Sequence, residues 1–346
     1  MNRVSLYAIA ALGFVVFFSS CAPSVKPSGP TTNLPKPVWP SPPETARISF
    51  ELSLTQPSDL GIKKGFFERF LELVVGEEDT RLIRPMAVAA TAANVLYVAD
   101  PGAKGVHRFD LSDNKYDLIT RENGAPLPSP VGLASDGTGR AWVTDSVLGA
   151  IFLIEPGSKE ALPLELDRPL KQPTGIALDT RGEHIFVVDT ADHKINIFSL
   201  DGRMAGSFGS RGAADGQFNY PTMIWIDEQN RLLVTDSLNF RVQIFDKEGN
   251  FLSKFGRLGD GSGDLSRPKG IASDTYGHIY IVDALFHSLQ IFDSNGRLLL
   301  NIGEQGRNFG EFWLPAGVFV SPDGRIYVAD AYNSRVQVFR YLGETL

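Results

Sequence analysis

The stretch Arg267–Gly303, RPKGIASDTYGHIYIVDALFHSLQIFDSNGRLLLNIG, contains four short apolar runs separated by turn-forming residues. Each run is three to five residues long, which is too short for a helix, and is bounded by Gly, Asp, Asn or Pro. The stretch therefore predicts a unit of four antiparallel strands, in which the second run ends at Asp283.

The same unit recurs along the chain, and the Asp that closes each second run marks it at intervals of 44 to 47 residues. These residues are Asp100, Asp145, Asp189, Asp236, Asp283 and Asp330. A proline opens each unit: Pro85, Pro130, Pro173, Pro221, Pro268 and Pro315. Four strands in a period of roughly 40–50 residues are typical of a β-propeller blade. The sequence thus predicts an all-β fold, a six-bladed propeller of four-stranded antiparallel blades.

The N-terminal segment, residues 1–21, has the pattern of a signal peptide, with Arg3 followed by an apolar stretch. It ends in Phe-Ser-Ser-Cys at Cys21, the single cysteine of the chain, and resembles a bacterial lipobox. The resemblance implies a lipid on Cys21 and a protein anchored in the cell envelope; we expect the protein to be a monomer. Ala22 follows instead of Asp, which favours the outer membrane.

Residues 22–46 hold eight prolines and predict an extended tether, which leaves residues 47–346 for the propeller. The sixth repeat ends at Phe339 without a fourth run, whereas an isolated strand is predicted at Ile48–Leu54. We expect this strand to close the last blade, because closure removes a free sheet edge. Lys64–Val75 has apolar residues at helical spacing and predicts a helix on the rim.

The repeats share the pattern P-x-G-I-A-x-D-x-x-G-x-I-Y-V-x-D…R-V-Q-x-F-D, best preserved in Pro221–Gly256, Pro268–Gly303 and Pro315–Phe339. Two of the turns also read D-x-x-N-x-R, from Asp236 and from Asp330. The pattern resembles the NHL-repeat family of β-propellers over residues 47–346. The resemblance implies the fold, but propeller scaffolds host unrelated activities.

Several polar motifs have a structural interpretation. An Asp repeated in every blade is expected to cap turns by accepting loop N–H groups. The glycines of Gly256–Gly263 recur in sister loops and are expected to be connectors, and Asp260–Asp264 lacks further oxygen ligands for calcium. A net charge of −7 argues against binding to nucleic acid.

The histidines bear on the question of an enzyme. In the related peptidylglycine amidating lyases, histidines after the blade-opening prolines hold zinc. Here those positions are occupied by Met86, Val131, Thr174, Thr222, Lys269 and Ala316. Neither a zinc site nor a Ser–His–Asp triad emerges from the spacing. The sequence predicts no catalytic residue, metal or cofactor; a metal-dependent lyase or hydrolase that uses the central channel stays open as the alternative.

Aromatic and basic residues gather in the loops that lead into the later blades and in the turns after their second strands. The candidate partner-binding residues are Tyr220, Phe240, Lys269, Phe286, His287, Trp313 and Tyr332. Arg241 and Arg335 lie in the same columns, where structural roles are expected. Such residues are enriched in protein interfaces. The favoured function is a non-catalytic interaction or assembly module for an envelope protein or peptide, with sugar or cell-wall binding as a further alternative.

Overall fold

The computed structural model describes residues 36–63, 79–91, 94–179 and 183–343. Residues 36–346 form one compact unit. Cys21, the start of the predicted tether and the predicted rim helix at Lys64–Val75 lie outside the described residues. Within those residues, no helix has the length and apolar character needed to span a membrane.

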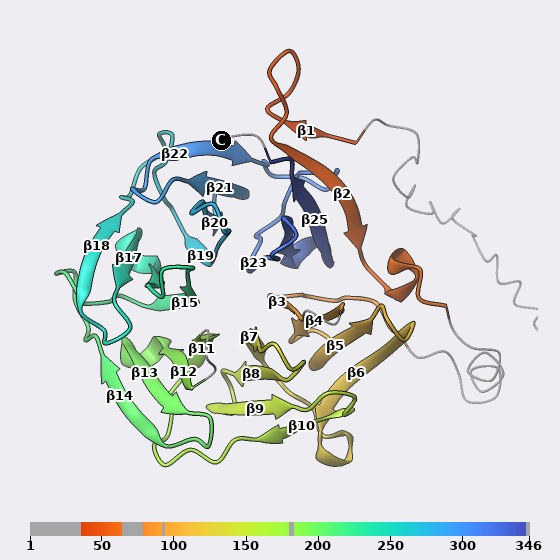
Figure 1. Ribbon diagram of the computed structural model, residues 1–346, viewed down its shortest axis with the longest axis vertical. Coiled ribbons are helices and arrows are strands. Elements are labelled where there is room, and N and C mark those ends of the chain that lie inside the picture. The colour runs from red at the N-terminus through yellow and green to blue at the C-terminus, as the bar shows by residue number, and fades with distance from the viewer. Residues whose placement is uncertain (1–35, 64–78, 92–93, 180–182, 344–346) are drawn as a thin grey trace, which may run out of the picture. The chain divides into compact units, whose positions relative to one another are not determined.

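Six blades surround a central axis, each with four antiparallel strands (Figure 1). The innermost strands are β3 (Ala87–Ala90), β7 (Pro130–Ser135), β11 (Pro173–Leu178), β15 (Pro221–Ile226), β19 (Pro268–Ser273) and β23 (Val318–Val320). The second strands are β4 (Val95–Asp100), β8 (Ala141–Asp145), β12 (His184–Asp189), β16 (Leu232–Asp236), β20 (Ile279–Asp283) and β24 (Arg325–Asp330).

The outer half of each blade follows the same order. The third strands are β5 (Gly105–Asp110), β9 (Ala150–Ile154), β13 (Lys194–Ser199), β17 (Arg241–Phe245), β21 (Ser288–Phe292) and β25 (Arg335–Tyr341). The outermost strands are β6 (Lys115–Arg121), β10 (Glu160–Pro163), β14 (Met204–Phe208), β18 (Phe251–Phe255), β22 (Leu298–Ile302) and β2 (Ile48–Leu54). The short 3-10 turns are η1 (Pro57–Leu60), η2 (Glu122–Gly124), η3 (Thr190–Asp192), η4 (Ser237–Asn239) and η5 (Ala331–Asn333). The predicted six-bladed, all-β fold is confirmed.

The ring is closed by the N-terminal strand, as the missing fourth run predicted. β2 pairs antiparallel with β25, from Ile48 opposite Tyr341 to Leu54 opposite Val336. Glu51 on β2 forms ion pairs with Arg325 (3.0 Å) and with Arg340. These pairs join β2, the N-terminal strand of the last blade, to β24 and β25, its C-terminal strands. They thereby connect the two ends of the propeller chain.

The predicted tether ends earlier than the sequence indicated. Val38–Trp39, expected within the tether, forms β1, which pairs antiparallel with β2 as a fifth strand of the last blade. The Trp39 ring packs on Phe339, with 5.6 Å between the ring centroids. Burial of an aromatic side chain on the sheet explains why this piece of a proline-rich segment is structured.

The hydrophobic core lies between adjacent blades. One cluster, for example, joins Tyr280 and Leu289 of the fifth blade to Ile326 and Phe339 of the sixth, all fully buried. The first two blades are connected in a second way, because their outermost strands β6 and β10 pair in parallel and merge the two sheets into one of eight strands.

The six innermost strands line a central cavity of about 190 Å³, and most of its lining is apolar. Four residues after the opening proline, four blades have an Ala, whereas the fourth and sixth blades have Trp225 and Phe319. The rings of Trp225 and Phe319 meet edge to face, with 5.8 Å between their centroids, although the fifth blade lies between their blades. The two aromatic rings thus contact one another within the channel lining and narrow the channel.

Candidate interaction face

The face that bears the six blade-opening prolines is called the proline face here. On it, the loop that enters each innermost strand meets the turn between the second and third strands. The six recurring aspartates lie at this junction and are 0–2% exposed. Their carboxylates accept backbone N–H groups of the incoming loop, from Ile83, Arg84, Ser129, Lys171, Gln172, Asn219, Ser266, Arg267 and Trp313. The predicted turn-capping role is confirmed by these hydrogen bonds.

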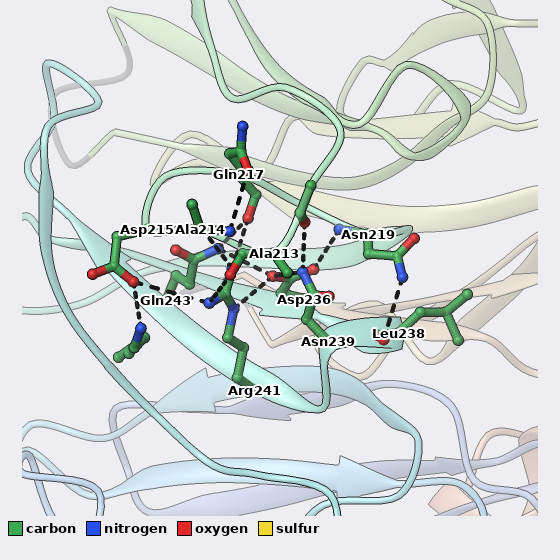
Figure 2. A network of polar contacts seen from close by, with 12 residues as sticks. Ala213, Ala214, Asp215, Gln217, Asn219, Asp236, Leu238, Asn239, Arg241 and Gln243 are labelled. Atoms are coloured by element: carbon green, nitrogen blue, oxygen red, sulfur yellow. Dashed lines mark hydrogen bonds and ion pairs between the residues drawn. The ribbon is translucent and has the colours of Figure 1, made fainter.

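The junction of the fourth blade shows how the carboxylate is held (Figure 2). Asp236 accepts the Asn219 N–H at 2.7 Å and pairs with Nε of Arg241 at 2.8 Å. The same guanidinium donates to the carbonyls of Ala213, Ala214 and Gln217 at 2.8–2.9 Å. Because Arg241 is buried and its donors are engaged, it is a structural residue, as expected.

The sixth blade repeats this network around Asp330 and Arg335. Arg335 Nε donates to Asp330 at 2.7 Å, and its other nitrogens bind the carbonyls of Arg307, Asn308 and Glu311. In the first blade the partner of the carboxylate is a histidine instead. His107 Nε2 lies 3.5 Å from Asp100, while Nδ1 lies 2.8 Å from the Tyr116 hydroxyl.

Burial by itself would raise the pKa of Asp100. The neighbouring His107 and the N–H groups of Ile83 and Ala103 outweigh that effect and hold the pKa of Asp100 below its ordinary value. The carboxylate is therefore a structural anion whose charge is compensated inside the protein.

Two histidines fix the path of the loops between blades. Nδ1 of His193 accepts the N–H of Tyr220 at 3.1 Å, and Nδ1 of His287 accepts the N–H of Leu314 at 3.0 Å. Tyr220 and Leu314 both precede a proline and have positive φ angles of 51° and 45°. Residues before proline favour extended backbone, so these hydrogen bonds hold a disfavoured conformation. His287 thus has a structural contact that the sequence did not reveal; partner binding by His287 stays a prediction.

The other candidate partner-binding residues lie on this face to different depths. Tyr332 is 56% exposed and Tyr220 is 42% exposed, whereas Phe240, Phe286 and Trp313 are half-buried. The Trp313 ring packs 6.3 Å from that of Tyr332 and also lies under the guanidinium of Arg307, 5.0 Å from its ring centroid. The structure thus brings Trp313 and Tyr332 together into one aromatic pair on the sixth blade.

Sequence reasoning missed two apolar residues of the same face. Val147 is 70% exposed and Leu285 is 54% exposed. Both lie two residues after the recurring Asp of their blade, as does Tyr332. This shared position in the turn was the signal that could have identified them.

Lys269 is half-buried on β19, one residue after Pro268. Burial lowers the pKa of Lys269, and the positive charges of Arg267 and Arg84 lower it further. Burial is the larger cause, and all three of these basic residues adjoin a blade-opening proline.

Each histidine in the described residues has a polar contact within the protein. His278 Nδ1 lies 2.7 Å from Asp274 on the opposite face. The one group of three possible metal ligands found among the described residues, Asp179, Glu183 and His184, is also on that face. There Asp179 accepts the Glu183 N–H at 2.7 Å and faces His184 at 3.4 Å, as an Asp that closes its own turn does in other blades.

Comparison with known families agrees with this architecture. The model for the NHL repeat matches residues 312–339, and a model described as a 6-bladed beta-propeller matches residues 229–284. The chain is a six-bladed β-propeller that contains an NHL repeat. Among curated proteins, the NHL propeller is 30% identical over 125 residues to mouse peptidyl-glycine alpha-amidating monooxygenase and 32% identical over 106 residues to the rat protein. These regions are 32% and 27% of this chain but only 13% and 11% of those relatives.

Solved structures with the same fold include enzymes and a binding protein. Virginiamycin B lyase from Staphylococcus aureus aligns with a TM-score of 0.56 and 14% identity, over 74% of this chain and 94% of the lyase. A gluconolactonase from Xanthomonas campestris gives 0.57 and 15%, over 91% and 99%. An auxiliary nutrient binding protein from Bacteroides thetaiotaomicron gives 0.60 and 11%, over 76% and 70%. At these identities the likeness establishes the fold alone.

Proposed function

We propose that this NHL propeller is a non-catalytic interaction or assembly module, lipid-anchored through Cys21 in the bacterial cell envelope, that binds an envelope protein or peptide. The observation that carries the proposal is the composition of the proline face. The charged side chains of its recurring aspartates, Arg241 and Arg335 are buried and engaged in internal hydrogen bonds. In contrast, the side chains of Val147, Leu285 and Tyr332 are exposed to solvent. Exposed apolar and aromatic side chains on a rigid support are the features of a partner surface.

Site-specific photo-cross-linking in the native envelope tests this role. A photoreactive phenylalanine derivative replaces Tyr332, and the matched control replaces Tyr276, which is 69% exposed on the opposite face. We expect one discrete cross-linked species from position 332 and none from position 276, both at native expression levels. Equal cross-linking from both positions, or none from either, would contradict the proposal.

The anchor has its own test. Substitution Cys21→Ala removes the only thiol of the chain and is expected to release the protein from the membrane fraction. Retention in the membrane pellet would contradict lipidation at this position.

A second candidate is a metal-dependent lyase or hydrolase that uses the central channel. It is favoured by the likeness to the amidating enzymes and to virginiamycin B lyase. Metal analysis of the purified full chain distinguishes the two, because a stoichiometric divalent metal that is lost on substitution of channel residues would support the enzyme.

A further inference from the structure

A groove of about 800 Å³ lies between the third and fourth blades, where turns of the face opposite to the proline face line it. Its walls come from β12, β13 and β14 of the third blade and from β15, β16 and β18 of the fourth (Figure 1). Ligand sites in proteins commonly have volumes of about 300–1,000 Å³. The groove therefore has the size of a ligand site, whereas the central cavity holds only about 190 Å³.

The outermost strand of the third blade lacks a bulky side chain where the groove lies. Gly206 on β14 lies opposite Ile197, at the position that Leu300 occupies opposite Ile291 in the fifth blade. Leu300 packs on the hydrophobic cluster between the fifth and sixth blades, whereas Gly206 has no side chain to fill the equivalent space. Ile197 is accordingly partly exposed in the groove, although its equivalents Ile244 and Ile291 are buried.

Neither the backbone nor its neighbours require a glycine at this position. The φ angle of Gly206 lies outside the left-handed region. A Cβ atom placed on Gly206 would meet, among the described residues, only Cδ1 of Ile197 at 3.8 Å, which is an ordinary van der Waals distance. Glycine in a strand weakens it, and such a glycine often marks the place where a ligand approaches the backbone. The strand thus keeps a destabilising residue at a place where it holds the groove open.

The walls of the groove are apolar, and its rim carries an excess of negative charge. Phe186 and Ile226 lie beside Ile197 in the lining. Four carboxylates and two cationic groups also line the groove: Asp179, Glu183, Asp246 and Glu248 against Arg231 and Lys247. Arg231 is already paired with Asp227 at 2.7 Å, and Asp227 is not part of the lining. The groove is therefore complementary in charge to a cation.

Two of the carboxylates converge at this rim. An oxygen of Asp179 and an oxygen of Glu183 lie within 4.8 Å of one another. The Glu183 side chain is exposed and has neither a hydrogen bond nor an ion pair with any residue that the structure describes. Two negative charges this close repel one another, and a cation bound between them removes the repulsion.

We propose that the groove between the third and fourth blades binds a small organic amine, whose apolar body lies on Ile197 and Phe186 and whose ammonium group meets Asp179 and Glu183. An amine uses both properties of the groove, because a bare metal ion would make no use of the apolar wall beside the carboxylates. The site is separate from the proline face, so an amine bound there leaves the proposed partner surface free.

A ¹⁹F NMR titration of full-length protein in mild detergent with para-fluorophenethylamine tests the chemical class of the ligand. The matched ligand is para-fluorophenethyl alcohol, which has the same apolar body without the charge. We expect the amine to bind roughly tenfold more tightly, because its ammonium group donates charge-assisted hydrogen bonds to the carboxylates. Equal affinities would overturn the choice of an amine, and an amine signal unchanged from that in detergent buffer alone would refute the site.

The variant Gly206→Leu tests the place of binding. We expect it to fold with a raised thermal midpoint, because leucine restricts the unfolded chain and buries apolar surface against Ile197. Binding of the amine should weaken by roughly tenfold or more, because the side chain fills the groove. The control is Ser253→Leu, at the same position of β18 opposite Ile244 and outside the groove lining, which should leave binding unchanged. Undiminished binding in Gly206→Leu would refute the groove as the site.

The variant Glu183→Gln tests the charge. It should weaken binding of the amine roughly tenfold and leave that of the alcohol unchanged. The control is Glu155→Gln, which removes the same charge from an exposed turn of the same face outside the groove. Equal weakening in both variants would show that net charge alone attracts the amine and would overturn the site. Zn²⁺ that displaces the amine at stoichiometric concentration, and that binds Gly206→Leu equally well, would assign the carboxylates to a metal ion instead.

Discussion

The two faces of the propeller use the same residue, aspartate, in different ways. On the proline face, each recurring carboxylate joins the loop between two blades to a turn, as Asp236 does with Asn219 and Arg241. On the opposite face, several aspartates close their own turns. Asp136, for example, accepts the N–H groups of Thr138 and Arg140 and pairs with the Arg140 guanidinium at 2.8 Å.

This difference shows where rigidity is built into the fold. A carboxylate that joins the incoming loop to a turn fixes that loop on the blade, whereas one that serves a single turn affects only that turn. The proline face can therefore hold exposed apolar side chains in place without help from a partner, which is the property that a binding surface needs.

The largest effect is expected from Asp236→Ala. It leaves the buried Arg241 charge and the Asn219 N–H without their acceptor, so unfolding free energy is expected to fall by about 3–5 kcal/mol. Urea denaturation measures the loss. Asp293→Ala, in a self-contained turn of the opposite face, is the matched control and is expected to lose less than about 1 kcal/mol. Similar losses of stability in both variants would contradict the view that aspartates of the proline face contribute more to stability than those of the opposite face.

The next effect concerns the histidine between the third and fourth blades. His193→Ala leaves the N–H of Tyr220 without its acceptor in a strained backbone, and a loss of about 1–3 kcal/mol is expected. Thermal unfolding followed by circular dichroism would measure it. His184→Ala on the opposite face, where the side chain is 41% exposed, should change the midpoint little. An unchanged unfolding midpoint in His193→Ala would show that the proline after Tyr220 is enough to fix the conformation of the loop.

The pH dependence of stability provides another comparison of the two faces. The folded-state pKa of Asp100 lies below the ordinary 3.8, so the stability it adds is complete above that pH and is lost as pH falls through the lower value. Burial raises the pKa of Asp136, but bonds from Thr138 and Arg140 lower it overall, so its contribution has the same sign. Urea denaturation between pH 7 and pH 3 should show that Asp100→Asn removes more of the acid dependence than Asp136→Asn. The reverse order would contradict the comparison.

The smallest effect is expected from Arg297→Ala. The Arg297 side chain is 79% exposed and lies 3.3 Å from Asp293 within one turn of the opposite face. Exposed pairs of this kind contribute about 0.5 kcal/mol or less, so the urea midpoint should hardly move. A loss of stability comparable with that of His193→Ala would show that these turns also stabilise other parts of the propeller.

Much of the fold could be predicted from the sequence because a propeller repeats itself. Six aspartates at intervals of 44 to 47 residues indicated the blades, and the incomplete last repeat indicated the closing role of Ile48–Leu54. β1 could not be predicted, because Val38–Trp39 lies among prolines and becomes a strand only beside the edge of β2.

The candidate site was less accessible to sequence reasoning. Lys269 was recognised as a candidate, but its partial burial could not be predicted from the sequence. Likewise, the acceptors of the Tyr220 and Leu314 N–H groups come from neighbouring blades, where no local pattern could reveal them. Contacts within one repeat follow from its pattern, whereas contacts between blades need the three-dimensional arrangement.

The position of β2 has a consequence for biosynthesis. This strand is made before every blade, yet its partner β25 is complete only at Tyr341. At a synthesis rate of about 5–20 residues per second, the intervening chain of nearly 300 residues takes roughly 15–60 s to make. During that interval β2 has no native partner, and the first blade lacks its neighbour on one side. Ring closure is therefore the contact of greatest sequence separation and the expected late step of folding.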